Sequence, residues 1–328
     1  MVSIRSFMAA AVAGTVATVL TGGAFAQAKW DMPIPYPDTN FHTKNVRQFV
    51  EDIAKASDGK FSITVHSNGS LIKHPEIKRA VQTGQVPIGE VLISLLSNEA
   101  AVFGFESNPF LATSYEQQRR LWAAAKPVLE KRLDSQGITL LYSVAWPPSA
   151  FHTKKALDSV ADLRGVKLRS YSAVTSRFAE LAGATPVLVP APEVAQAFRS
   201  GMIDAQINSS AGGVDTQTWD ATTYFYNVQA LMPQNVVLVN KAAFNKLDPS
   251  AQKTIRDAAS AAETRGWAQS VAENDANIKT LASKGIKILE PPAKLATELQ
   301  EIGKRMAAEW AAKAGAEGDA ILKAYQGN

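Results

Sequence analysis

The sequence predicts an α/β protein with two lobes, mixed sheets and one long helix that spans both lobes. Short alternating strands and amphipathic helices follow one another along the chain, which is the pattern of an α/β fold. The 328 residues are enough for two domains. A helical segment that begins at Pro249 runs for about 35 residues, or roughly 50 Å, which exceeds the width of a single domain.

The first 26 residues are predicted to be a secretory signal peptide. Arg5 precedes an apolar run from Phe7 to Leu20, and Ala24-Phe25-Ala26 supplies the small residues of a cleavage site. A membrane anchor is the alternative, but the apolar run is short for a span. We therefore expect an exported mature chain that begins near Gln27 and does not span the membrane.

Composition and motifs exclude several classes of function. The chain has no cysteine, which removes disulfides, thiolate catalysis and cysteine zinc sites. The formal net charge is +4, or +3 without Arg5, and no basic stripe suited to nucleic acid is present. The histidines have no metal-ligand spacing, and no phosphate-binding glycine loop or serine elbow occurs. A binding protein without metal or cofactor is therefore favoured over an enzyme.

Strands are predicted where apolar and polar residues alternate between turn or breaker residues. The strand at 138–146 ends at Pro147-Pro148, and the next segment reads as a return strand. The pattern predicts mainly parallel pairing. The predicted strands are 29–34, 61–66, 86–93, 138–146, 149–154, 163–169, 185–189 and 202–208.

Helices are predicted where apolar residues share one face of a 3.6-residue period. In the first of them, Val46, Phe49, Val50 and Ile53 lie on one side. Glycine ends two others, at Gly84 and Gly137. The shorter predicted helices are 40–56, 75–83, 115–136, 174–182 and 192–200.

The long helix, 249–284, links the two predicted lobes. Asp248 caps its start, Pro249 occupies the first helical position, and Gly285 follows its end. A coiled coil is the alternative, but no heptad is sustained. The predicted first lobe is 27–148 plus 234–266, and the predicted second lobe is 149–233 plus 267–328.

Arg169 is the leading candidate for ligand binding. It ends the strand LRGVKLR (163–169), and ligand clefts of α/β folds lie where strands end. Arginine grips a carboxylate with two parallel hydrogen bonds. The alternative is a solvated surface charge, which is the interpretation we give to Arg164 and Lys167 because they alternate outward.

Several separated motifs carry a resemblance to a known family. LRGVKLR is followed by a helix and by GATPVLVPAPEVAQAFRSGMIDAQINS, and DGKFSITVHSNGSL, AVQTGQVPIG and FESNPFLATSYEQ precede it in order. The mature chain resembles the solute-binding proteins of TRAP transporters. That resemblance implies a two-lobed periplasmic-binding-protein-like fold and a non-enzymatic receptor in the periplasm of a Gram-negative bacterium. It also implies that the receptor binds a small organic acid anion and delivers it to the membrane subunits of a TRAP permease.

The resemblance also implies site residues. Arg169 matches the strand-end arginine that holds the ligand carboxylate, and Asn208 matches the asparagine that assists it. The chain departs from the pattern, because Asp204-Ala205 replaces Asp-Gly and serines follow Asn208. Tyr171, close to the strand-end arginine, is also assigned to the site.

The predicted ligand is an aromatic or 2-oxo monocarboxylate such as benzoylformate. No second arginine stands among the cleft-facing candidates, which are aromatic or imidazole side chains. The alternatives are a C4-dicarboxylate or another aliphatic acid, with Arg177 or Lys154 as the second cation, and a sensor domain for a signalling partner. The further candidate ligand-binding residues are Trp146, Phe151, His152 and Trp219.

Overall fold

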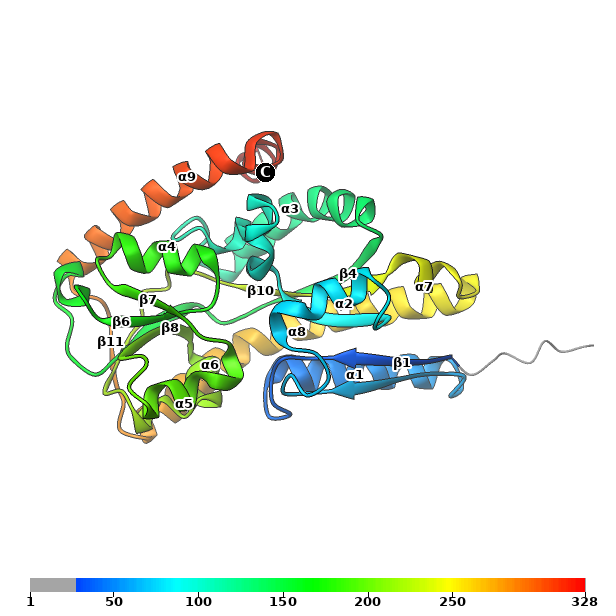
Figure 1. Ribbon diagram of the computed structural model, residues 1–328, viewed down its shortest axis with the longest axis horizontal. Coiled ribbons are helices and arrows are strands. Elements are labelled where there is room, and N and C mark those ends of the chain that lie inside the picture. Colours follow the sequence, from blue (N-terminus) through cyan, green and yellow to red (C-terminus); the bar gives the residue numbers. More distant parts are fainter. Residues whose placement is uncertain (1–27, 328) are drawn as a thin grey trace, which may run out of the picture.

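The computed structural model describes residues 28–327, so the predicted signal peptide lies outside the described residues. Two lobes lie side by side; residues 28–145, coloured from blue to teal-green, build most of one, and residues 149–226, in the later greens, build most of the other (Figure 1). The two-lobed α/β fold with mixed sheets and a long shared helix is therefore confirmed. Within the described residues, no helix is long and apolar enough to cross a bilayer.

The first lobe is built on a three-stranded antiparallel sheet of order β3-β10-β4. A separate parallel pair, β1-β2, lies beside it. The strands are β1 (Ala28–Pro33), β2 (Phe61–His66), β3 (Ile88–Leu92), β4 (Ile138–Ala145) and β10 (Gln234–Asn240). The helices are α1 (Phe41–Ala56), α2 (Ile77–Gln82), α3 (Tyr115–Ser135) and α7 (Lys241–Asn245), with short 3-10 helices at His74–Glu76, Ile93–Asn98 and Ala101–Ser107.

The second lobe is built on a six-stranded sheet of order β11-β9-β5-β8-β6-β7. The strands are β5 (Ser149–Thr153), β6 (Lys167–Ser170), β7 (Thr185–Leu188), β8 (Ala205–Ser209), β9 (Tyr224–Tyr226) and β11 (Lys287–Leu289). The helices are α4 (Ala173–Leu181), α5 (Val194–Arg199) and α6 (Ser210–Asp215), with 3-10 helices at Val160–Leu163, Ala191–Glu193 and Thr218–Asp220.

The prediction of mainly parallel pairing is wrong. Half of the observed strand pairs are antiparallel, and all of these involve β10 or β5. The reason is topological. Both strands directly follow a segment that crosses between the lobes, and each runs in the direction opposite to its neighbours in the sheet it enters. The predicted strand at 149–154 corresponds to β5, but it does not return alongside β4; it pairs antiparallel with β8 and β9 in the second-lobe sheet.

Two long helices join the lobes. In α8 (Pro249–Ser283) the Asp248 side chain accepts a hydrogen bond from the Ala251 amide at 3.0 Å, as a cap does. This helix packs against α1 and β4 of the first lobe and against α6 and β11 of the second. The other helix, α9 (Ala293–Gln326), is kinked at Gly315.

The C-terminal part of α9 packs on the first lobe. Trp310 and Ile321 belong to the same hydrophobic cluster as Phe105 and Leu121 of that lobe. In Figure 1, α9 accordingly extends from the second lobe toward α3. The predicted boundary had placed residues 267–328 wholly in the second lobe.

Two chain segments cross between the sheets next to each other. The Trp146 amide donates to the Pro233 carbonyl and the Ser149 amide donates to the Leu231 carbonyl, both at 2.7 Å. The residues between β4 and β5 therefore pair with the residues before β10. This paired crossing lies directly beside the cavity described next.

Candidate functional site

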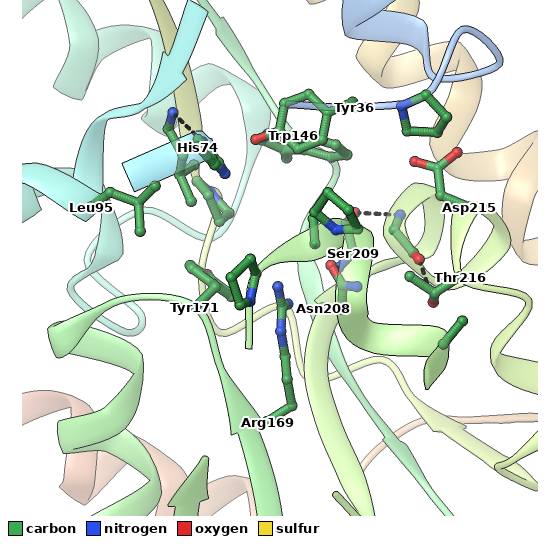
Figure 2. Close-up of a pocket in the computed structure, with 18 of the residues that line it drawn as sticks. Tyr36, His74, Leu95, Trp146, Arg169, Tyr171, Asn208, Ser209, Asp215 and Thr216 are labelled. Atoms are coloured by element: carbon green, nitrogen blue, oxygen red, sulfur yellow. Dashed lines mark hydrogen bonds between the residues drawn. The ribbon is translucent and has the colours of Figure 1, made fainter. Parts of the chain in front are cut away.

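A cavity of about 390 Å³ lies between the two lobes. Figure 2 shows Tyr36, His74 and Trp146 on one side and Arg169, Tyr171 and Asn208 on the other. The first group comes from the first lobe and the second group from the second lobe. The remaining lining residues are mostly apolar or small, among them Leu92, Leu95, Leu188, Pro190 and Ala195.

Arg169 brings a positive charge into this cavity. It occupies β6, and only 3% of its surface is exposed. Its Nε donates to the Val189 carbonyl at 3.0 Å, and its guanidinium lies 5.1 Å from the centre of the Tyr171 ring. Burial lowers the pKa of Arg169 to about 10, so it stays charged at neutral pH.

No carboxylate among residues 28–327 forms an ion pair with Arg169, and no hydrogen bond engages its two terminal nitrogens. A buried guanidinium without a counter-ion is costly for the fold. The same arrangement is suited to an external carboxylate, which two parallel N–H groups can hold.

Asn208 lies beside Arg169 because β6 and β8 are neighbouring parallel strands. Its side chain donates to Gln206 Oε1 at 3.1 Å and accepts from the Ser209 amide at 3.0 Å. Gly212 makes room for it, since a Cβ at that position would lie 2.2 Å from Asn208 Oδ1. Any side chain at position 212 would therefore displace Asn208.

Two hydroxyl groups on the cavity wall lie within reach of each other but make no well-formed hydrogen bond within the described chain. These are the Tyr171 phenol and the Ser149 hydroxyl, and both oxygens are buried. Burial raises the pKa of the Tyr171 phenol, so it stays protonated and can donate. Buried polar groups are normally paired, so unpaired groups facing a cavity are available to a ligand.

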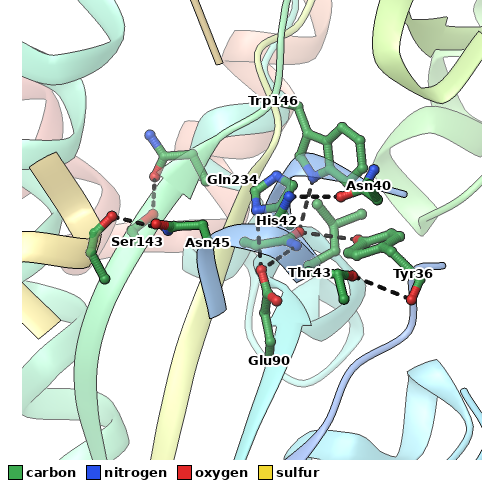
Figure 3. A network of polar contacts seen from close by, with 12 residues as sticks. Tyr36, Asn40, His42, Thr43, Asn45, Glu90, Ser143, Trp146 and Gln234 are labelled. Atoms are coloured by element: carbon green, nitrogen blue, oxygen red, sulfur yellow. Dashed lines mark hydrogen bonds and ion pairs between the residues drawn. The ribbon is translucent and has the colours of Figure 1, made fainter. Parts of the chain in front are cut away.

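The first-lobe wall is held by a buried polar network (Figure 3). Tyr36 Oη and Trp146 Nε1 both donate to Asn235 Oδ1, at 3.1 and 3.0 Å. Asn235 Nδ2 donates to Glu90 Oε1 at 2.7 Å, and His42 Nδ1 lies 3.1 Å from the same oxygen. All five side chains are buried, and the Tyr36 and Trp146 rings meet edge to face at 4.8 Å. Their orientation is therefore fixed without a ligand.

His74 completes this wall as a neutral ring. Its Nε2 accepts a hydrogen bond from the Leu92 amide at 3.2 Å, so the neutral ring carries its proton on Nδ1. Burial, together with a smaller effect of the charge of Arg169, lowers the pKa of His74 to about 3. Near neutral pH, Arg169 is therefore positively charged and His74 is neutral.

The structure brings four of the predicted site residues together and leaves three elsewhere. Arg169, Asn208, Trp146 and Tyr171 line the cavity. Phe151, His152 and Trp219 do not line it.

Phe151 is fully buried in β5 and stacks on Phe178 at 6.0 Å. His152 is buried against Phe225, and burial lowers its pKa to about 4. The Trp219 ring packs in a small cluster with Leu281 and lies 5.6 Å from Lys284 Nζ.

Sequence reasoning missed Tyr36, His74, Ser149 and Asp215, all of which line the cavity. Tyr36 lies in a loop and His74 begins a short 3-10 helix, both far from Arg169 in sequence, so no periodicity points to them. Asp215 ends a short helix whose only sequence signal is a pair of glycines. No group of three or more metal-ligating side chains occurs among the residues that the structure describes.

The family model of bacterial extracellular solute-binding proteins, family 7, matches residues 35–314. The chain belongs to this family. The predicted membership among TRAP solute-binding proteins is thereby confirmed, and the family consists of receptors for solutes outside the cytoplasm. A solute-binding protein of Albidiferax ferrireducens is 24% identical over 282 residues, covering 82% of this chain and 80% of that one.

Two solved structures of family members are closely similar to this solute-binding protein. DctP6 of Bordetella pertussis, an extracytoplasmic solute receptor that binds pyroglutamic acid, superposes with a TM-score of 0.91 at 46% identity. It covers 92% of this chain and 100% of its own length. A TRAP solute-binding protein from a marine metagenome, specific for pyroglutamate, has a TM-score of 0.90 at 39% identity, with the same coverage.

Proposed function

We propose that this chain is a periplasmic receptor that binds pyroglutamate, or a closely related small lactam acid, and delivers it to a TRAP permease. The observation that carries the proposal is the buried guanidinium of Arg169, which has no ion-pair partner among the described residues and lines an interlobe cavity. A ligand carboxylate would supply the missing counter-ion. We infer no enzymatic role, in keeping with a family of solute receptors.

The choice of pyroglutamate rests on the relatives and on the cavity. The two pyroglutamate-binding proteins match at 46% and 39% identity over nine-tenths of the chain. The cavity offers Arg169 for a carboxylate and unpaired hydroxyls of Tyr171 and Ser149 for further polar atoms. Its aromatic wall of Tyr36 and Trp146 suits the faces of a flat ring.

An aromatic monocarboxylate such as benzoylformate is the second candidate. The apolar side chains Leu92 and Leu95 next to Trp146 favour it, because they would bury a phenyl ring. Such a ligand would leave more of the polar cavity atoms without partners, which costs affinity. We therefore place it after pyroglutamate.

A dicarboxylate finds less support. The two further cations considered from the sequence are already paired, since Arg177 bonds Glu309 at 2.8 Å and Lys154 bonds Asp204 at 3.2 Å. Neither lines the cavity. A second ligand carboxylate would be buried without a cation, which is unfavourable.

The test is a calorimetric titration of the ligand-free protein, prepared by unfolding and refolding, with pyroglutamate, benzoylformate and succinate. Pyroglutamate should bind at least tenfold more tightly than the other two and should raise the thermal midpoint by mass action. If benzoylformate or succinate binds more tightly than pyroglutamate, that compound becomes the proposed ligand and the receptor role stands. Failure of every carboxylate tested would overturn the proposal.

The partner is tested separately in proteoliposomes that hold the TRAP permease encoded with this receptor. Labelled pyroglutamate should accumulate only when the receptor is present outside and an ion gradient is applied. Accumulation that does not depend on the receptor would remove the delivery role.

A further inference from the structure

Asp215 places a carboxylate at the edge of the ligand cavity, away from Arg169 (Figure 2). It is the last residue of α6 on the second lobe. Its Oδ2 accepts a hydrogen bond from Asn40 Nδ2 of the first lobe at 2.5 Å. Its other oxygen, Oδ1, has no hydrogen-bond donor among residues 28–327.

No cation within the described chain pairs with Asp215. Lys44 of α1 is the positive group that acts on it at a distance, and Glu273 of α8 is the negative one. Burial raises the pKa of Asp215 to about 6, so near neutral pH it is ionised and can only accept hydrogen bonds.

An acceptor-only group restricts what a ligand can present to it. A second carboxylate or a ring oxygen would meet a like charge or a lone pair, whereas a neutral N–H or O–H would gain a charge-assisted hydrogen bond. Lactam acids combine one carboxylate with one such N–H. The cavity offers a matching pair of groups, the Arg169 cation and the Asp215 anion.

We propose that Asp215 is a specificity-determining residue that accepts a hydrogen bond from a neutral donor on the ligand, the ring N–H of a lactam acid. This inference rests on the proposed function, since it requires that Arg169 holds the ligand carboxylate. Asn40 orients the Asp215 side chain by occupying Oδ2 and leaving Oδ1 for the ligand. The preference for a lactam over an aromatic acid or a dicarboxylate then follows from one side chain.

The experiment compares pyroglutamate with its lactone isostere, 5-oxotetrahydrofuran-2-carboxylate, in which an oxygen replaces the ring N–H. The wild-type protein should bind the lactone at least tenfold more weakly, because a lone pair replaces the donor facing Asp215. The wild-type comparison needs no variant and so does not depend on how a substitution folds.

The Asp215→Asn variant should reduce the ratio of lactam to lactone affinity to threefold or less, or invert it. The reason is that the asparagine oxygen can keep the bond from Asn40 while its amide group faces the ligand as a donor. The matched control is Asp220→Asn, an exposed aspartate on the neighbouring 3-10 helix, which should keep the wild-type ratio.

The outcomes separate the two proposals. If the wild-type protein binds lactam and lactone within threefold of each other, or if Asp215→Asn keeps the wild-type ratio, the role of Asp215 is overturned and the receptor function stands. If the wild-type protein binds neither compound, the pyroglutamate proposal fails, and the inference fails with it.

Discussion

The two walls of the interlobe cavity differ in how their polar groups are satisfied. On the first lobe, Tyr36 and Trp146 are tied through Asn235 to Glu90, so their polar atoms are already paired (Figure 3). On the second lobe, Arg169 has two terminal nitrogens without partners and the Tyr171 hydroxyl is buried unpaired. The polar atoms of Tyr36 and Trp146 are therefore paired without a ligand, whereas those of Arg169 and Tyr171 are not.

Because of this difference, we expect the first lobe to supply a wall of fixed shape and the second lobe to supply the polar groups that bind the ligand. A wall whose hydrogen bonds are made internally keeps its shape, which lowers the entropy lost on binding. On a wall with unpaired polar groups, those groups form new hydrogen bonds with the ligand. While no ligand is bound, the same unpaired groups lower the stability of the protein. Substitutions on the first wall should act mainly on stability, and substitutions on the second mainly on affinity.

The largest expected effect is on the first wall. The substitution Asn235→Leu leaves the Tyr36 hydroxyl and the Trp146 indole N–H without their partner, whereas the Glu90 oxygen keeps its contact with His42. At about 1–3 kcal/mol for each of these two buried unpaired groups, the free energy of unfolding should fall by roughly 2–6 kcal/mol. Urea unfolding of the ligand-free protein measures it.

The control is Asn227→Leu, where the lost bond is an exposed contact with Glu290. It should change the unfolding midpoint little, because surface substitutions usually act within about 0.5 kcal/mol. Equal midpoints for the two variants would contradict the assignment of Asn235 to the wall.

The second largest effect is on the second wall. The substitution Arg169→Ala removes the cation that holds the carboxylate, and losing a buried charged partner costs about 2–5 kcal/mol of binding free energy. Pyroglutamate affinity should therefore fall by about 30-fold to several thousand-fold in a calorimetric titration. The thermal midpoint of the ligand-free variant should change little, because the relief of a buried charge without a counter-ion offsets the lost hydrogen bond to the Val189 carbonyl.

Arg164→Ala is the matched control, since Arg164 is an exposed arginine near the same strand. It should bind as the wild type does. An Arg169→Ala protein that binds within threefold of the wild type would remove Arg169 from the site.

A smaller effect is expected from pH, and Asp215 of the second lobe should contribute to it. The pKa of Asp215 is raised to about 6 by burial and by Glu273, with the hydrogen bond from Asn40 and the charge of Lys44 opposing, whereas the pKa of His74 is held at about 3. A ligand N–H stabilises the ionised carboxylate and so lowers its pKa, which means that protons compete with the ligand. Pyroglutamate affinity should therefore fall by up to roughly tenfold between pH 7 and pH 5.

The pH effect is checked by titrating the wild-type and Asp215→Asn proteins at both pH values. The variant should show a shallower profile, because Asp215 no longer titrates, while the buried Glu106, whose pKa burial raises to about 7, still does. An affinity that rises as the pH falls, or a variant with the wild-type profile, would assign the titration to another group.

The smallest effects come from a matched pair of hydroxyl deletions, one on each wall. Tyr36→Phe removes a hydrogen bond to Asn235 and should lower the free energy of unfolding by about 1 kcal/mol. Tyr171→Phe removes a buried hydroxyl without a partner, so the stability of the ligand-free protein should hold or rise. Thermal unfolding scans of the two ligand-free variants measure the difference. The same loss of stability in both variants would contradict the proposed difference between the walls.

Much of the fold was predictable because its signals are local. The cap at Asp248, the proline at the first helical position and the later glycine defined α8 to within one residue. The breaker residues that follow β4 and α3 did the same for those elements. Capping and turn preferences depend on a few neighbouring residues, so sequence alone contains them.

Two large elements were missed for want of such signals. The strand β10 lies at the centre of the first-lobe sheet and reads QNVVLVN, a short apolar run whose length suits either a strand or a buried helix segment. The helix α9 begins after Pro292 without a side-chain cap, and it is kinked at Gly315. Tertiary packing against β3, β4 and α3 decides both.

The sequence by itself determined the α/β class, the shared long helix and the arginine at the end of β6, because each depends on residues close together in the chain. Only the tertiary structure decided which side chains surround that arginine. Tyr36, His74 and Asp215 reach the cavity from three distant segments, while the predicted aromatic Phe151 is buried against Phe178. A strand pattern fixes which face a side chain takes, but whether that face meets a cavity or a helix depends on packing across the sheet.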